Sequence, residues 1–86
     1  MSAEVLIYGT RFCPYCIRAR MLLDSKGVSY QDIRVDDDAA LRRTMSEMSG
    51  RHTVPQIWIG ETHVGGFSEL HRLDYEGQLD RLLELE

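Results

Sequence analysis

The sequence places both of its cysteines within four residues, Cys13-Pro14-Tyr15-Cys16. An apolar, strand-like run precedes this motif and a helix-like run follows it. At a helix N-terminus, unpaired N–H groups and the helix dipole favour the thiolate, which is the nucleophile of cysteine chemistry. Residues three apart lie one turn apart on the same helical face, so the two sulfurs are within reach of a mutual disulfide. The motif therefore predicts a redox dithiol.

The two cysteines are expected to have different roles. If the helix begins at Pro14, Cys13 is its N-cap, and its sulfur can face the free N–H groups of Tyr15 and Cys16. Cys16 lies inside the first turn, where it is more shielded, and should stay protonated until it is needed. We therefore expect Cys13 to attack a substrate sulfur and Cys16 to resolve the mixed disulfide that results.

Two other interpretations of the pair are weaker. Free cysteines are often small buried side chains, but their spacing at a strand-to-helix junction favours redox chemistry. A zinc site needs about four ligands. The other candidates are His52, His63 and His71, none of them at a spacing typical of zinc motifs. We predict no metal ligand and no tightly bound cofactor.

Composition indicates an ordinary globular protein. The chain has 86 residues, of which 43% are hydrophobic and 28% charged, so we expect one domain over residues 1–86. Its net charge of −4 argues against nucleic acid or an anionic membrane as a partner. No apolar run approaches the roughly 20 residues that span a bilayer, and no signal-peptide pattern is visible. We expect a cytoplasmic protein, in which thiols are kept reduced.

The remaining chain predicts an α/β domain with the element order β-α-β-α-β-β-α. Strands are expected at 5–8, 28–35, 55–59 and 62–64, and helices at 14–26, 36–49 and 67–85, the last bending near 74–77. A strand, helix and strand at this spacing predict a parallel pair joined by a right-handed crossover. The tight turn at Gly60-Glu61 predicts an antiparallel hairpin. The Gly9–Phe12 segment is expected to be a loop.

Apolar spacing predicts which side of each helix is buried. In the first helix we expect Ile17, Met21 and Leu22 on that side, and in the second Leu41, Met45 and Met48. In the last helical region the expected buried residues are Leu70, Leu73, Leu79, Leu82 and Leu83. The acidic run Asp36-Asp37-Asp38 is interpreted as an N-cap with dipole-complementing charge rather than an anionic binding tail.

Two further motifs could bind a ligand. In Thr53-Val54-Pro55, a trans proline that opens a strand is the ordinary expectation. A cis bond would instead turn the backbone of Val54 toward a peptide-like ligand beside Cys13. In Gly65-Gly66-Phe67-Ser68, the glycines allow close approach of the backbone, and the N–H groups that open a helix could bind a carboxylate with the Ser68 hydroxyl. A plain turn with a capping serine fits that segment equally well.

These three motifs, in this order and at this spacing, resemble the glutaredoxins, specifically the small dithiol type. The resemblance runs through almost the whole chain. It implies a thioredoxin fold with a four-stranded mixed sheet flanked by helices, a cis Pro55, and glutathione as co-substrate in a groove next to Cys13. The glutathione contacts that it implies are Tyr15 at the flank, Thr53 and Val54 at the cysteinyl part, and Gly66, Phe67 and Ser68 at the γ-glutamyl carboxylate.

The sequence departs from the family at two of these contacts. Many members have a lysine three residues before the nucleophile, where this chain has Thr10. Arg11 or Arg51 would then supply the positive charge for the glycine carboxylate of glutathione. The acidic residue usual after Gly-Gly-x is Ser68 here, with Glu69 next.

The resemblance implies a glutathione-dependent thiol–disulfide oxidoreductase that acts on glutathionylated or disulfide-containing proteins, and we expect it to be a monomer. Three alternatives remain at this point. They are a thioredoxin-like electron carrier reduced by a flavoenzyme, a dimeric iron–sulfur cluster carrier, and a non-catalytic interaction module. Pro14 disfavours the cluster carrier, because cluster-binding members more often have a small residue there.

Overall fold

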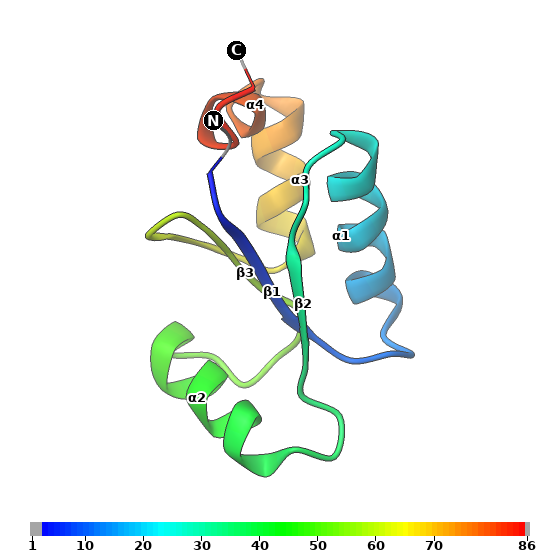
Figure 1. Cartoon of the computed structure of the whole chain (residues 1–86), viewed down its shortest axis with the longest axis vertical. Coiled ribbons are helices and arrows are strands. Elements are labelled where there is room, and N and C mark those ends of the chain that lie inside the picture. Colours follow the sequence, from blue (N-terminus) through cyan, green and yellow to red (C-terminus); the bar gives the residue numbers. More distant parts are fainter. Residues whose placement is uncertain (1–2, 86) are drawn as a thin grey trace.

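The computed structural model describes residues 3–85, which form one mixed β-sheet covered by helices on both faces (Figure 1). The strands are β1 (Val5–Gly9), β2 (Gln31–Arg34), β3 (Gln56–Ile59) and β4 (Thr62–Gly65). The helices are α1 (Pro14–Ser25), α2 (Ala39–Ser49), α3 (Phe67–Tyr75) and α4 (Leu79–Leu82). Within the described residues, no helix is long and apolar enough to cross a membrane.

The sheet has the strand order β2-β1-β3-β4. Strand β1 pairs with β2 in parallel and with β3 antiparallel, and β3 pairs antiparallel with β4. The predicted parallel pair and the predicted hairpin are therefore both confirmed. Because β1 is central, the loop that follows it, which carries Cys13, emerges from the middle of the sheet.

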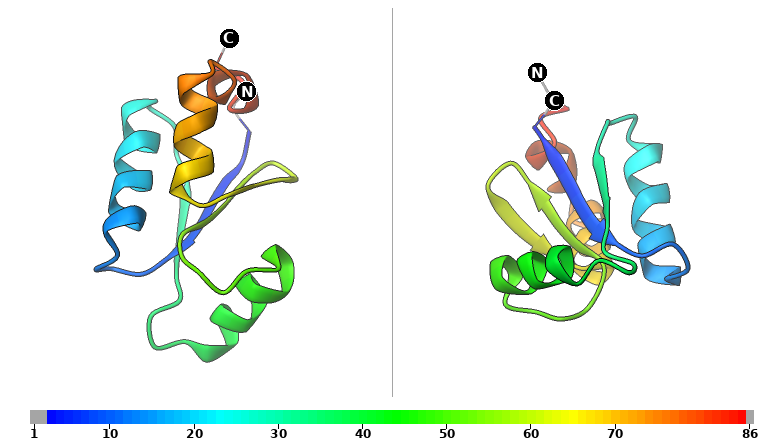
Figure 2. Two further views of the ribbon diagram at one scale, coloured as in Figure 1. Left: turned by 180° about the vertical axis from the view of Figure 1, so that it is seen from behind. Right: turned by 60° about the horizontal axis from the view of Figure 1, so that its bottom comes forward.

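Strand side chains alternate between the two faces, and each face has its own core. Helices α1, α3 and α4 cover one face, and α2 lies on the other side of the sheet (Figure 2). The larger core cluster contains Val5, Ile7, Ala19, Leu23, Ile57, Ile59, Leu70, Leu79 and Leu83. The smaller cluster, beneath α2, contains Tyr8, Val35, Met45 and Trp58. Burial on both faces explains why β1 and β3 are almost continuously apolar.

All four strands differ from their predicted bounds by at least one residue, and the largest difference is in β2. Strand β2 covers only Gln31–Arg34 of the expected 28–35, and Val28 and Tyr30 pack against the core from the segment before it. Their side chains pack against the core although these residues lie outside the strand. Because only part of 28–35 is a strand, apolar and polar residues do not alternate regularly over this range. Gly9, expected in the loop, ends β1 and pairs with Arg34.

The buried face of α1 was predicted wrongly. Ile17 and Met21 are exposed, and only Leu22 of the predicted set packs against the core. The fully buried residues are Cys16, Ala19 and Leu23, which recur at the spacing of one helical face. The rotation of α1 is therefore set by the burial of Cys16 against the sheet and not by its largest apolar side chains.

The acidic run 36–38 caps α2 as predicted, but the helix begins at Ala39 rather than at residue 36, and no acidic residue lies in its first turn. Asp38 is the N-cap, and its Oδ1 accepts a hydrogen bond from the Leu41 N–H at 3.0 Å. Met45 is fully buried and Leu41 is half-buried, but Met48 is 51% exposed, so its predicted burial was wrong. The C-terminal region bends as expected, with Gly77 between α3 and α4, and the predicted leucines lie at or beside the core.

Two methionines of α2 allow a matched test of this packing. We expect Met45→Ala to lower the free energy of unfolding by about 2–5 kcal/mol, because it leaves a cavity beneath the helix. Met48→Ala should change it by less than about 0.5 kcal/mol, since its side chain is exposed. Urea unfolding followed by circular dichroism measures both values. Equal losses in the two variants would contradict this packing of α2.

Candidate active site

Cys13 is the N-cap of α1, as predicted. Its backbone is extended, and its Sγ accepts a hydrogen bond from the Cys16 N–H at 3.3 Å. On its other side, Sγ lies 3.8 Å from the Val54 carbonyl oxygen, to which the thiol form donates. Cys13 is partly exposed. Its sulfur is thus held between a helix N-terminus and the backbone of Thr53-Val54-Pro55, and it can be reached from solvent.

Cys16 lies in a different environment. Its side chain is fully buried, and this burial raises the pKa of the thiol to about 11. The hydrogen bond and the charge of Cys13 also raise it, whereas a backbone hydrogen bond from Thr10 and the charge of Arg20 lower it. At neutral pH Cys16 is therefore a protonated thiol directly behind Cys13, and the two sulfurs are chemically unequal.

A groove of about 220 Å³ lies beside this motif. Its lining residues come from the start of α1, the segment between α2 and β3, and the start of α3, and they are Tyr15, Arg51, Thr53, Val54, Pro55, Gly66, Phe67, Ser68 and Glu69. All the residues that the resemblance implies as glutathione contacts, except Arg11, are among these lining residues. The Val54–Pro55 peptide bond is cis, as the resemblance implies.

Arg11 is the candidate residue that the structure does not bring to the groove. Its guanidinium lies 6.0 Å from the ring centroid of Phe12, and its backbone N–H donates to Asp36 Oδ2 at 3.1 Å. The basic residue that lines the groove is Arg51. Of the two arginines left open by the sequence, Arg51 is therefore the one placed to meet a carboxylate in the groove.

The first turn of α3 is partly occupied by its own side chain. The Gly66 N–H donates to Glu69 Oε1 at 2.8 Å, so this group is not available to a ligand in the structure. The N–H groups left for a carboxylate are therefore those that follow Gly66. Phe67 and Ser68 are the first two residues of α3, where N–H groups have no acceptor within the helix.

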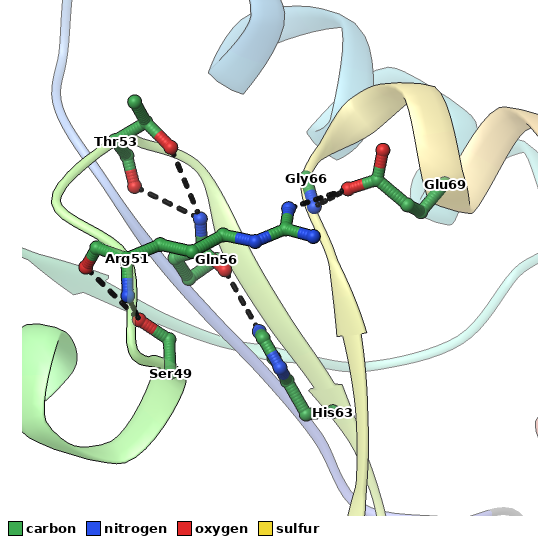
Figure 3. Close-up of polar contacts among 7 residues, drawn as sticks. All are labelled: Ser49, Arg51, Thr53, Gln56, His63, Gly66 and Glu69. Atoms are coloured by element: carbon green, nitrogen blue, oxygen red, sulfur yellow. Dashed lines mark hydrogen bonds and ion pairs between the residues drawn. The ribbon is translucent and has the colours of Figure 1, made fainter.

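An ion pair connects the two walls of the groove. Arg51 Nη1 lies 2.8 Å from Glu69 Oε1, the same oxygen that accepts from Gly66 (Figure 3). These two contacts lower the pKa of the Glu69 carboxyl. Gly65 makes the arrangement possible, because a Cβ there would lie 2.5 Å from Glu69 Oε1 and its φ is +114°. This role of Glu69 was not predicted, although its position three residues after Gly66 is a helix-capping signal.

A row of hydrogen-bonded polar side chains supports the wall of the groove that is formed by the segment between α2 and β3. The Gln56 side chain is fully buried, and its Nε2 donates to the Thr53 carbonyl at 3.1 Å. Its Oε1 lies 2.8 Å from His63 Nε2, which must therefore carry the proton (Figure 3). Gln56 thus holds the Thr53 backbone at the groove. Gln56 is a polar residue inside an otherwise apolar strand, and this pattern was the sequence signal for its supporting role.

Comparison with known proteins agrees with this geometry. The glutaredoxin family model matches residues 5–64. A glutaredoxin of Pseudomonas aeruginosa is 56% identical over 79 residues, which cover 92% of this chain and 94% of that protein. The chain belongs to the glutaredoxin family. Its cysteine pair is accordingly that of a thiol–disulfide oxidoreductase.

Solved glutaredoxins show the same fold. The Brucella melitensis glutaredoxin superposes with a TM-score of 0.84 at 48% identity, covering 95% of this chain and 89% of that one. A buckwheat glutaredoxin–glutathione complex superposes with a TM-score of 0.86 at 29% identity, covering 93% and 76% of the two chains. The predicted thioredoxin fold is therefore confirmed.

The Glu69 contacts predict a pH-dependent stability. A carboxyl whose pKa is lowered on folding stabilises the native state above its unfolded pKa, and this contribution is lost as the pH falls through the folded pKa. We expect Glu69→Gln to be less stable than the wild type at pH 7, with the difference closing in acid. Urea unfolding of both proteins, from pH 7 down through the pH at which glutamate side chains take up a proton, measures this difference in the free energy of unfolding.

Glu76→Gln is the matched control, because Glu76 pairs with the largely exposed Arg72 in the same helix. Its effect should be smaller and depend less on pH, since exposed ion pairs contribute little. A Glu69→Gln difference that persists unchanged in acid would contradict the assigned ionic role.

Proposed function

We propose that this glutaredoxin is a glutathione-dependent oxidoreductase that reduces protein–glutathione mixed disulfides and protein disulfides. The observation that carries the proposal is the groove, which begins at the Cys13 motif and offers an anion site at α3 and a cation at Arg51. Glutathione has a thiol and two carboxylates, and the groove beside the Cys13 motif offers a helix N-terminus and an arginine to anionic groups. The buckwheat glutaredoxin solved with glutathione supports the same ligand.

In this binding mode each part of glutathione meets a group of matching chemistry. The γ-glutamyl carboxylate accepts from the N–H groups of Phe67 and Ser68 at the positive end of α3. The cysteinyl backbone lies along Val54, which places its sulfur at Cys13. The glycine carboxylate pairs with Arg51, a contact that competes with the internal ion pair to Glu69. Glu69, when released, carries the negative charge that the ligand's ammonium group requires.

With a glutathionylated protein, Cys13 alone carries out the exchange. The Cys13 thiolate attacks the glutathione sulfur, forming a Cys13–glutathione disulfide, and the protein leaves as a thiolate that takes up a proton. A second glutathione thiolate then attacks the sulfur of the bound glutathione. Oxidised glutathione leaves and the Cys13 thiolate returns. Both steps are thiol–disulfide exchanges, whose rates depend on thiolate fraction and leaving-group pKa.

A protein disulfide requires Cys16 as well. Cys13 attacks one sulfur and forms a mixed disulfide with the protein. Cys16 then attacks Cys13, giving a Cys13–Cys16 disulfide and the reduced protein dithiol. Two glutathione molecules reduce the enzyme and leave as oxidised glutathione. Cys16 is well placed for this step, since its N–H already contacts the Cys13 sulfur.

Substitution of each cysteine tests this division of roles. We expect Cys13→Ser to lose at least about 10³-fold in turnover with every substrate, because it removes the nucleophile. Cys16→Ser should still reduce a glutathione mixed disulfide but not a protein disulfide. Coupled assays with glutathione and glutathione reductase measure the first activity, and insulin reduction measures the second.

The outcomes also distinguish the alternatives. If Cys16→Ser loses all deglutathionylation, the single-thiol route is wrong. If the wild type is inert with glutathione but turns over with thioredoxin reductase, it is a thioredoxin-like carrier. Absorbance in the visible range on isolation would indicate an iron–sulfur cluster carrier.

The two arginines left open by the sequence provide a matched pair. We expect Arg51→Gln to raise the KM for glutathione about two- to fivefold, because it removes a half-exposed charge from the groove. Arg11→Gln should leave this KM nearly unchanged, since its side chain lies outside the groove. Steady-state kinetics with varied glutathione measure both. A larger effect at Arg11 would place the glycine carboxylate elsewhere.

A further inference from the structure

Arg20 is a largely buried cation one helical turn beyond Cys16. Its side chain is 13% exposed, and its Nη2 donates to the Thr10 carbonyl oxygen at 3.0 Å. Its Nε lies 3.2 Å from Asp32 Oδ2 on β2, without the alignment of a hydrogen bond. Burying a charged side chain is costly unless it has partners, so its position beneath the active-site loop needs an explanation.

Gly9 allows the Arg20 guanidinium to come close to the Cys16 thiol. A Cβ on Gly9 would lie 3.0 Å from Cys16 Sγ and 3.2 Å from Arg20 Nη2. Both atoms therefore border the same small space over the end of β1. Any larger residue at this position would come between them or displace one of them.

The charge of Arg20 is only partly neutralised by its partner. Asp32 Oδ2 also lies 3.5 Å from Arg34 Nε, so two arginines share one carboxylate. Asp32 alone therefore does not neutralise both arginines. Burial raises the pKa of the nearby Tyr30 hydroxyl, as do Asp24 and Asp32, whereas Arg20 lowers it, so Asp24 is a second carboxylate in this neighbourhood. Cys16 thus faces Cys13 within its own helix, the Thr10 backbone in the loop, and the Arg20 guanidinium across Gly9.

We propose that Arg20 is a positioning residue for the resolving step, in which it stabilises the Cys16 thiolate during reduction of protein disulfides. It does so through its charge and by holding Thr10, whose backbone contacts the Cys16 sulfur. This inference rests on the proposed dithiol reaction. It predicts that Arg20 affects the route through Cys16 and spares the route through Cys13 alone.

The resolving step requires the Cys16 thiolate, which a nearby positive charge favours. Cys16 loses its proton and its sulfur attacks Cys13, so that a Cys13–Cys16 bond forms and the bond from Cys13 to the substrate sulfur breaks. The substrate leaves as a thiolate and takes up a proton. The substrate gains two electrons, which the two cysteines lose. No other oxidant or reductant takes part.

The groups that raise and lower the pKa of the Cys16 thiol are not the same once Cys13 has formed the mixed disulfide. In the free enzyme, burial and the neighbouring Cys13 raise the pKa of Cys16. Once the Cys13 sulfur is bonded to the substrate, it carries no charge to oppose a second thiolate. Burial then remains as the opposing influence, and the Thr10 backbone and Arg20 remain to favour ionisation. Both of the latter depend on the Arg20 side chain.

The test measures the resolving step directly. Cys13 is first converted to its glutathione mixed disulfide, and the release of glutathione by Cys16 is then followed against pH in a rapid-mixing experiment. We expect Arg20→Met to resolve about three- to tenfold more slowly than the wild type at pH 7. The expected loss is moderate, because a thiolate of higher pKa is also the better nucleophile. The difference should close as the pH rises and both enzymes ionise.

Two further variants separate charge from structure. Arg20→Lys should recover most of the rate, since it keeps the positive charge. Asp32→Asn should resolve at least as fast as the wild type, because it removes the neutralising carboxylate but retains Arg20.

Arg43→Met is the charge-matched control. Arg43 is an exposed arginine on α2, and its replacement should not change the resolving rate. Turnover of a small glutathione mixed disulfide should stay within about twofold in Arg20→Met, because that route does not use Cys16.

Three results with Arg20→Met would overturn the proposal. They are a resolving rate equal to that of the wild type, a loss of resolving rate that is the same at every pH, and an equal loss of turnover in the single-thiol assay. Slower resolution in Asp32→Asn would also contradict it, and this variant tests the idea even if Arg20→Met does not fold. A wild type that is inert with glutathione mixed disulfides would refute the proposed function instead, while the preformed adduct would still report on Arg20.

Discussion

The hydrogen bond from the Cys16 N–H to the Cys13 sulfur is the contact on which the rest of the site depends. It makes Cys13 the cap of α1, while the burial of Cys16 against the sheet sets the rotation of the helix. With that rotation, Cys13 faces the Val54 carbonyl and the groove, and Cys16 is buried beneath it. Arg20 follows one turn later and Leu23 enters the core. The cap and the burial of Cys16 together determine which sulfur is accessible and which is protected.

The groove depends on a different kind of contact, because its walls come from segments far apart in the sequence. Arg51 and Glu69 join the segment before β3 to the start of α3, and Gln56 holds Thr53 from within the sheet. These contacts give the groove a shape before any ligand arrives, which lowers the ordering cost of binding.

Local signals predicted the elements well, because caps and turns act over a few residues. Pro14 marked the start of α1, the acidic run 36–38 marked the start of α2 to within three residues, and Gly60-Glu61 marked the hairpin. The buried faces were less predictable. In α1 the buried side follows Cys16 rather than the larger Ile17 and Met21, and in α2 the sheet covers Met45 but not Met48. Burial depends on what lies opposite a residue, and apolar spacing does not contain that information.

The sequence by itself determined that a nucleophilic cysteine would cap a helix, with a second cysteine one turn behind it, because both features depend on spacing and on backbone N–H groups. It also supplied the residues that line the groove. Only the tertiary structure decided that Arg51, and not Arg11, lies in the groove, and that Glu69 takes the Gly66 N–H. It alone brought Arg20 to Cys16 across Gly9. Such choices arise where distant segments pack together, since a charge acts on whatever the fold places beside it.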